Sequence, residues 1–207
     1  MLKILGKCSS INVRKVLWTC AELGLPFERE DWGAGFRPTA APEFVTLNPN
    51  AMVPVMIDDG FVLWESNTIC RYLCAQNKGE ALLPAAPQLR ARVEQWMDWQ
   101  ATQLNTAWRY AFMALVRHDA AFSDAAQVQA SIGNWSRQLG ILDRHLETSG
   151  GFVAGDSFTL ADIVLGLSIN RWLLTPLAHP DYPALAAYYD RLGGRAGFAA
   201  FCGNGTP

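Results

Sequence analysis

Apolar and polar positions follow different patterns in the two halves of the chain. In about the first eighty residues, short apolar runs suited to strands alternate with segments whose apolar positions recur at helical spacing. The predicted order is β-α-β-α-β-β-α, which indicates an α/β domain. The segments are strand 2–5, helix 12–23, strand 27–31, helix 42–47, strands 54–57 and 61–64, and helix 66–76.

Glycine and proline mark several of these boundaries. Gly24 and Pro26 end the first predicted helix, because glycine favours a helix C-terminus and proline cannot continue the helix. Asp59-Gly60, between two short apolar runs, is a strong hairpin signal. These boundaries support the strand and helix order given above.

Beyond residue 88, apolar positions recur only at helical spacing. Residues 78–88 contain Gly79, Pro84 and Pro87 and show little periodicity, so they are predicted to form a linker. We therefore expect an α/β domain over 1–77 and an all-helical domain over 89–207. Helices are predicted over 89–118, 123–148, 160–174, 182–192 and 195–201. Thr159-x-x-Asp162 has the form of a capping box, whose expected role is in folding.

Composition narrows the range of functions. Half of the 207 residues are hydrophobic and 17% are charged, which suits a sizeable core. The net charge is −2 and no run of five or more basic residues occurs, so nucleic acid is not expected as the main partner. No apolar run reaches the roughly 18 residues of a membrane helix, and no signal-peptide segment is seen, so a cytoplasmic location is expected.

The five cysteines argue against a metal site. They are odd in number and lack zinc-type spacing, and the three histidines lie far from them in sequence. We expect reduced thiols and no bound metal. The cysteines are Cys8, Cys20, Cys70, Cys74 and Cys202.

Two dipeptides suggest a binding site. Val53-Pro54 closes a loop, and Glu65-Ser66 ends a strand and opens a helix. Backbone amides exposed in such places suit a small peptide ligand with carboxylates. Alternatively, Pro54 only starts an edge strand, and Ser66 only caps a helix.

These dipeptides, Asn48-Pro49, the β-α-β-α-β-β-α order and the helical second half together resemble the cytosolic glutathione S-transferases. Residues 10–17 resemble the start of the first helix in serine-type, theta- or phi-like members, including bacterial ones. The resemblance covers essentially the whole chain. It implies a thioredoxin-like N-terminal domain, a helical substrate domain, glutathione as co-substrate and a homodimer. The implied reaction is attack of the glutathione thiolate on an electrophile in detoxification, or reduction of a peroxide.

The resemblance also implies which residues bind glutathione. Val53-Pro54 would have a cis bond, and the Val53 backbone would pair with the cysteinyl unit. Glu65 and Ser66 would bind the γ-glutamyl ammonium and carboxylate. Arg37 would bind the glycyl carboxylate, although a solvated loop arginine is an equal alternative.

Activation of the glutathione sulfur has several candidates. Ser10 could donate its hydroxyl to the thiolate, and Asn12 could donate its amide instead. Ser9 and Cys8 remain further alternatives, and each of these residues could also be a plain helix cap. Cys8 leads to a rival function, a glutathione-dependent thiol–disulfide reductase.

The loop before Val53 departs from the family pattern Asn-Pro-x-Gly-(Lys/Gln)-Val-Pro. Ala51 stands at the glycine, and Met52 cannot donate a side-chain hydrogen bond. We therefore expect weaker glutathione binding. A non-catalytic binding protein with this fold is the second rival.

Aromatic side chains gather near the end of predicted helix 89–118. By resemblance, this region would bind an apolar or aromatic electrophile, with Arg109 steadying an anionic substrate or leaving group. Core packing is the alternative for each of these residues. The predicted pocket residues are Trp108, Arg109, Phe112 and Met113, with Tyr110 and Val116 nearby.

Overall fold

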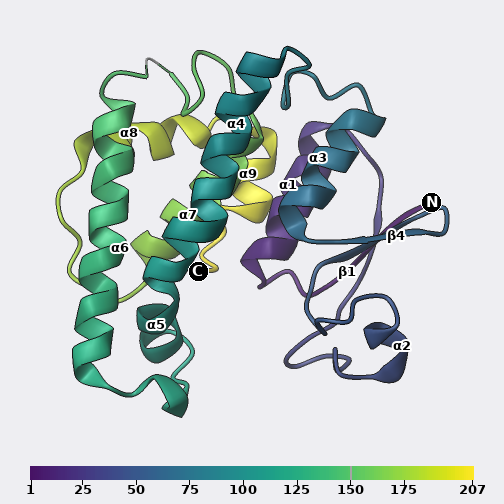
Figure 1. The fold of residues 1–207 in the computed structure, drawn as a ribbon, viewed down its shortest axis with the longest axis horizontal. Coiled ribbons are helices and arrows are strands. Elements are labelled where there is room, and N and C mark those ends of the chain that lie inside the picture. The colour runs from purple at the N-terminus through teal and green to yellow at the C-terminus, as the bar shows by residue number, and fades with distance from the viewer. Residues whose placement is uncertain (150) are drawn as a thin grey trace. The chain divides into compact units, whose positions relative to one another are not determined.

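The computed structural model describes residues 1–149 and 151–207 (Figure 1). It contains two compact units. The first comprises Met1–Pro84 with Arg195–Asn204, and the second comprises Ala85–Gly194 with Gly205–Pro207. The predicted fold class, an α/β thioredoxin-like domain followed by helices, is confirmed.

The first unit is built on a four-stranded mixed sheet of order β2-β1-β3-β4. Strand β1 is parallel to β2 and antiparallel to β3, and β3 and β4 form an antiparallel hairpin. Asp59 and Gly60 both have positive φ, 46° and 90°, as the predicted tight hairpin turn requires. The strands are β1 (Leu2–Leu5), β2 (Glu28–Glu30), β3 (Val55–Asp58) and β4 (Phe61–Trp64).

Helices cover both faces of this sheet. On one side α1 (Ile11–Glu22) and α3 (Ser66–Gln76) lie against each other, and α2 (Pro42–Val45) lies on the other side (Figure 1). The core beneath α2 contains the buried side chains Leu5, Trp32, Phe44 and Val55. Successive strand residues face opposite sides, so Ile4 and Met56 point toward α1 and α3.

The last helix, α9 (Ala196–Phe201), belongs to the first unit, although the predicted second domain, 89–207, included it. Gly197 allows the close approach of α9 to α1, because a Cβ there would lie 2.7 Å from Trp18 Nε1. Arg195 also forms an ion pair with Glu22 at 2.5 Å. A contact that depends on one missing methyl group leaves no periodic signal in the sequence.

Within the residues described, the second unit is built of helices, with an isolated β-bridge between Phe152 and Gly155. Helix α7 is buried on nearly every side, which explains why its sequence is apolar almost throughout. No helix in the described ranges is long and apolar enough to cross a membrane. The helices are α4 (Pro87–Trp99), η1 (Gln100–Leu104), α5 (Asn105–Leu115), η2 (Ala120–Phe122), α6 (Ala125–Leu146), α7 (Leu160–Leu174) and α8 (Pro183–Leu192).

Residues 89–118 were expected to form one long helix, and the structure divides this segment. A π-helical turn, η1, separates α4 from α5, and α5 ends at Leu115. At the start of the turn, the buried Gln100 amide donates to Asn105 Oδ1 at 2.9 Å and to Ser168 Oγ at 3.0 Å. Such turns are rare and short and have no residue signature of their own, so the apolar pattern did not reveal this one.

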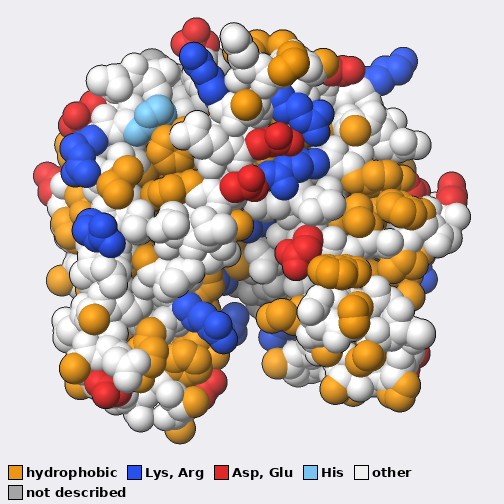
Figure 2. All heavy atoms as spheres, in the orientation of Figure 1, with side chains coloured by type: hydrophobic (Ala, Val, Ile, Leu, Met, Phe, Trp, Pro, Cys, Tyr) orange, Lys and Arg blue, Asp and Glu red, His pale blue; other side chains and the backbone are white. Residues whose placement is uncertain are grey.

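Charges of both signs are interspersed on the molecular face drawn in Figure 2. This arrangement agrees with the small net charge of −2. Nucleic-acid-binding surfaces instead concentrate positive charge, since they must neutralise several phosphates.

The predicted capping box at the start of α7 is present. The buried Asp162 carboxylate accepts hydrogen bonds from Thr159 N–H at 2.7 Å and from Thr159 Oγ1 at 2.9 Å. It also accepts from Val153 N–H at 3.0 Å and from the Tyr188 hydroxyl at 2.6 Å. Burial raises the pKa of Asp162, while these four donors act in the opposite direction. Asp162 therefore joins α7, α8 and the loop before α7.

Replacing Asp162 should destabilise the protein strongly. Asp162→Ala leaves buried donors of Thr159, Val153 and Tyr188 without an acceptor, so the free energy of unfolding should fall by about 3 kcal/mol or more. Tyr188→Phe removes one donor only and should cost about 1 kcal/mol. Urea unfolding at fixed protein concentration measures both. Equal, small losses would contradict this role.

Ala51 adopts a backbone conformation that alanine rarely takes, with φ of 52°. Steric repulsion involving Cβ makes this left-handed region unfavourable for residues other than glycine, by about 1 kcal/mol. The loop thus has the conformation suited to the family's glycine, although the chain has alanine there. Replacing that alanine should relieve the strain.

Ala51→Gly should raise the free energy of unfolding by up to about 1 kcal/mol. Ala91 provides a control of opposite sign, because it is an exposed residue within the ordinary helix α4. Ala91→Gly should lower the same quantity by about 1 kcal/mol. Denaturant unfolding of both variants tests the prediction, and destabilisation by both would refute it.

Candidate active site

The strand register gathers the predicted glutathione-binding segments at one end of the sheet. Leu5, at the end of β1, pairs with Val55 at the start of β3, and Val55 pairs with Trp64 at the end of β4. The loop after β1, the segment before β3 and the residues after β4 therefore emerge side by side. Glu30, the last residue of β2, pairs with Leu5 at the same end.

Ser10 is the N-cap residue of α1, with extended φ and ψ of −84° and 123°. Its backbone is engaged, since its N–H donates to Lys7 O at 3.1 Å and its carbonyl accepts from Arg14 N–H at 3.0 Å. Its side chain makes no capping hydrogen bond to α1. The hydroxyl is therefore not committed to its own helix and can donate to a bound anion.

The other sulfur-activating candidates lie in the same loop and first helical turn. Asn12 is half-buried in the first turn of α1, two residues after Ser10. Ser9 is also half-buried, and Cys8 is exposed with a free thiol. The helix N-terminus itself favours an anion, because its first N–H groups lack intrahelical partners.

Gly6 brings this loop against Val53, a contact that the sequence analysis did not predict. A Cβ on Gly6 would lie 2.5 Å from Val13 Cγ2 and 3.0 Å from Val53 Cβ. Gly6 also has a φ of 148°, which side chains rarely adopt. Only glycine lets the loop after β1 approach Val53 so closely.

The peptide bond between Val53 and Pro54 is cis, as the resemblance implied. The loop before it is fixed by Asn48, which is 3% exposed. Asn48 Nδ2 donates to Met52 O at 2.8 Å, and Asn48 Oδ1 accepts from Asn50 N–H at 3.0 Å. The sequence analysis used Asn48 only as part of a motif, whereas the structure gives its side chain a positioning role.

Glu65 and Ser66 lie where β4 passes into α3. Glu65 is exposed and has a φ of 72°, an unusual value for a residue with a side chain. Ser66 is the first residue of α3 and is 7% exposed. Non-glycine residues with such backbone angles cluster at ligand sites. A second helix N-terminus thus lies at the same sheet end as α1.

Arg37 lies in the loop after β2 and is held by several neighbours. Its guanidinium stacks 4.0 Å from the centre of the Trp32 ring and pairs with Glu30 at 3.4 Å and Glu43 at 3.8 Å. The Lys3 ammonium, 2.7 Å from Glu30, is the main cause of a lowered pKa of that carboxyl. Arg37 is thus oriented, but two carboxylates already contact it.

The aromatic residues of α5 form a cluster in the second unit. The rings of Trp108 and Phe112 meet edge to face, 5.4 Å apart, and Trp135 of α6 lies 6.2 Å from Trp108. Two arginines lie against these rings. The guanidinium of Arg171 of α7 lies 4.4 Å from the Trp108 ring centre and 4.1 Å from the Phe112 ring centre, and that of Arg117 lies 5.3 Å from the Phe112 ring centre. Sequence reasoning missed Arg171, because it lies on a different helix.

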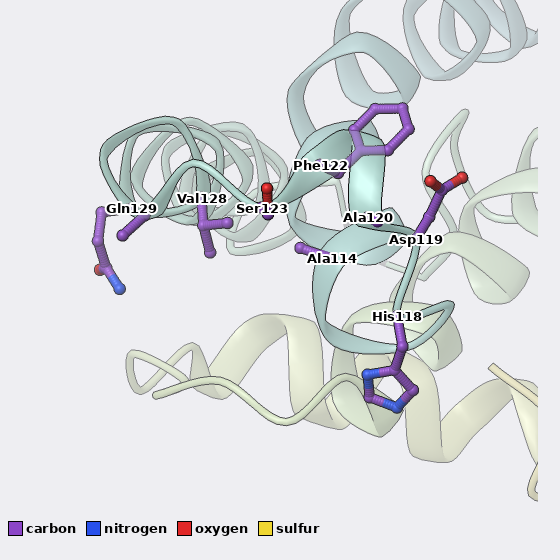
Figure 3. Close-up of a pocket in the computed structure, with 9 residues that line it drawn as sticks. Ala114, His118, Asp119, Ala120, Phe122, Ser123, Val128 and Gln129 are labelled. Carbon is purple, nitrogen blue, oxygen red and sulfur yellow. The ribbon is translucent and has the colours of Figure 1, made fainter.

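The other two predicted pocket residues differ in exposure. Arg109 is exposed, and Met113 is half-buried next to the buried Phe112. Beyond Met113, a cavity of about 440 Å³ lies between the end of α5 and the start of α6 (Figure 3). None of the predicted pocket residues lines this cavity. It is lined by Ala114, His118, Asp119, Ala120, Phe122, Ser123, Ala125, Val128 and Gln129.

Comparisons with known proteins agree with this geometry. Family models described as the N-terminal and C-terminal domains of glutathione S-transferase match residues 9–76 and 125–191. Glutathione S-transferase GstB of Escherichia coli K12 is 36% identical over 194 residues, covering 93% of each chain. Glutathione S-transferase 3 of Zea mays is 33% identical, covering 90% of this chain and 83% of its own.

Solved structures lead to the same family. A theta-class glutathione S-transferase of Xanthomonas axonopodis pv. citri, with glutathione bound, superposes with a TM-score of 0.91 at 36% identity. The match covers 97% of this chain and 96% of that one. A delta-class enzyme of Nilaparvata lugens gives a TM-score of 0.90 at 26% identity, covering 100% and 95%. The predicted family is confirmed, and the chain belongs to the glutathione S-transferases, a family of enzymes.

Proposed function

We propose that this transferase binds glutathione at the sheet end described above and uses the glutathione thiolate to attack an electrophilic substrate. The observation that carries the proposal is the meeting of two helix N-termini, at Ser10 and Ser66, beside the cis bond of Val53-Pro54. Helix N-termini favour anions, and glutathione has two carboxylates and an ionisable thiol.

Each part of glutathione has a proposed partner. The Val53 backbone pairs with the cysteinyl unit, as an added strand would. Ser66 donates its hydroxyl and backbone N–H to the γ-glutamyl carboxylate at the N-terminus of α3, and Glu65 pairs with the ammonium. Arg37 is the proposed partner of the glycyl carboxylate, which would compete with Glu30 and Glu43 for the guanidinium.

Ser10 and Asn12 are the proposed donors to the thiolate. A thiol with a pKa near 8.5 is mostly protonated at pH 7, and the thiolate is the nucleophile. A donated hydrogen bond and the N-terminus of α1 both favour the charged form and so lower the thiol pKa. The uncommitted Ser10 hydroxyl supports Ser10 as the principal donor.

The second substrate is proposed to bind at the aromatic cluster of α5, through Trp108, Phe112 and Met113. The sulfur then forms a bond to an electrophilic carbon, whose leaving group departs with the bonding electrons, or it is oxidised as a peroxide is reduced. Arg109 and Arg171 are the candidate cations for an anionic substrate or leaving group. Arg171 contacts the rings but is only 3% exposed, whereas Arg109 is exposed.

A homodimer in the cytoplasm is also proposed. Strand β4 lies at the edge of the sheet and exposes Phe61 and Trp64, which a second copy would cover. By family resemblance, α3 and α4 would contribute to that interface. Sedimentation at micromolar concentration distinguishes a dimer of twice 22.8 kDa from a monomer.

Removing the Ser10 hydroxyl should raise the pKa of the bound thiol. Ser10→Ala should shift the acid limb of the pH dependence of kcat/KM upward by about one pH unit, because a hydrogen bond to a charged group is worth about 1.5–3 kcal/mol. Activity below that pKa should fall about tenfold or more, with little change in glutathione affinity. An aryl-halide conjugation assay across pH, with calorimetric titration of glutathione, measures both.

Asn12→Ala and Cys8→Ser are the matched variants for this test. Asn12→Ala should shift the limb less than Ser10→Ala if Ser10 is the main donor. Cys8→Ser should leave conjugation unchanged, whereas a reductase that uses Cys8 would lose its disulfide-reducing activity. If the acid limb of the kcat/KM profile shifted in neither Ser10→Ala nor Asn12→Ala, the proposed activation of the thiol would be ruled out.

Met52 is proposed to weaken glutathione binding, because it is exposed and cannot donate to the ligand. Met52→Gln supplies a donor and should lower the glutathione dissociation constant about three- to tenfold. Met52→Leu is the control and should leave it unchanged. Titration calorimetry measures both dissociation constants. An unchanged dissociation constant in Met52→Gln would refute this explanation.

A further inference from the structure

A second cavity lies between α7 and α8, and its lining includes no residue proposed for the transferase reaction. Its volume is about 230 Å³, smaller than typical drug-binding pockets and suited to a ligand of about one ring. All of its lining belongs to the second unit. The lining residues are Ile169, Trp172, Leu173, His179, Pro180, Asp181, Tyr182, Leu185, Ala186, Tyr189 and Asp190.

Aromatic rings in the wall of this cavity are held in place. Trp172 stacks on Tyr182, with ring centres 5.7 Å apart at 27°, and meets the His179 ring edge to face at 4.4 Å. His179 Nε2 lies 2.8 Å from Trp172 O and donates to it, since a carbonyl oxygen only accepts. The rings are therefore fixed before any ligand arrives.

The polar tips of the two tyrosines are bound to other parts of the unit. The Tyr182 hydroxyl donates to Ser136 O at 2.7 Å, and the Tyr189 hydroxyl donates to Asn170 Oδ1 at 2.8 Å. These bonds hold the phenol groups in position, so their rings remain as apolar walls.

With histidine counted as neutral, the formal charge of the lining is negative. Asp181 and Asp190 are both exposed at the cavity, and the described lining contains no lysine or arginine. Aromatic ring faces attract cations electrostatically, and a carboxylate within reach adds a direct charge attraction. A negative charge on a ligand would be repelled by both aspartates.

From these contacts we infer that the α7–α8 cavity binds a small organic cation, a quaternary or aryl ammonium group, separately from glutathione. The rings of Trp172, Tyr182 and Tyr189 contact the apolar part of the ligand and its cationic group. Asp181 and Asp190 supply the counter-charge. Glutathione, with two carboxylates, is unsuited to this site.

Phenyltrimethylammonium is the probe for the experiment, and benzenesulfonate is an anion of similar size. Calorimetric titration of the whole protein should show saturable binding of the cation and none of the anion. Tryptophan fluorescence should change over the same concentration range, because Trp172 lines the cavity. Equal binding of both probes, or binding of neither, would overturn the inference.

Two substitutions test where the cation binds. The double variant Asp181→Asn/Asp190→Asn keeps the shape and removes the charge, and should weaken binding about two- to thirtyfold. Ala186→Phe fills the cavity from an exposed position of α8 and should abolish binding. Unchanged affinity in either variant would place the cation elsewhere and so contradict the inference.

Two further variants serve as matched controls. Ala187→Phe adds the same ring at an exposed position of α8 outside the lining, and Asp156→Asn removes an exposed charge elsewhere in the unit. Both should bind the cation as the unaltered protein does. Conjugation activity with glutathione should be unchanged in all of these variants. The test thus remains independent of the proposed transferase mechanism.

Discussion

The approach of Gly6 to Val53 is the constraint on which the glutathione-binding end of this protein depends. Strand pairing of β1 with β3 brings the two segments to the same edge, and the absence of a side chain on Gly6 lets them touch. The start of α1 follows within a few residues, so this contact also determines where Ser10 lies relative to the cis bond. Backbone proximity, rather than a cluster of reactive side chains, defines the site.

This dependence on backbone explains what the sequence could predict. Turns and helix ends need particular residues, so Asp59-Gly60, Ser66 and the Thr159–Asp162 box marked local structure that the fold contains. Their order along the chain was enough to recognise the family. Comparison with the family pattern also singled out Ala51. The structure gives this residue a positive φ, although it lacks the glycine that favours such a value.

Contacts between helices that are distant in sequence could not be predicted, because each contact depends on which helix faces pack against each other. Arg171 packs on Trp108 and Phe112 from a helix that was recognised only as an apolar run. Helix α9 packs on α1 through Gly197, and the π-helical turn η1 divides a segment whose pattern predicted one helix. Periodicity identifies the buried face of a helix but not its partner.

The glutathione-binding end and the sites in the helical unit therefore differ in how readily their residues can be substituted. The glutathione end uses main-chain geometry, and substitution at Gly6 would disturb Val13 and Val53 together. The α5 cluster and the α7–α8 cavity are instead lined by side chains of helices and of the loop before α8. Exchange of Ala186 or Asp181 would alter a ligand preference with little effect on the fold, since both are exposed. Ligand preference in the helical unit can therefore vary while the glutathione end is preserved.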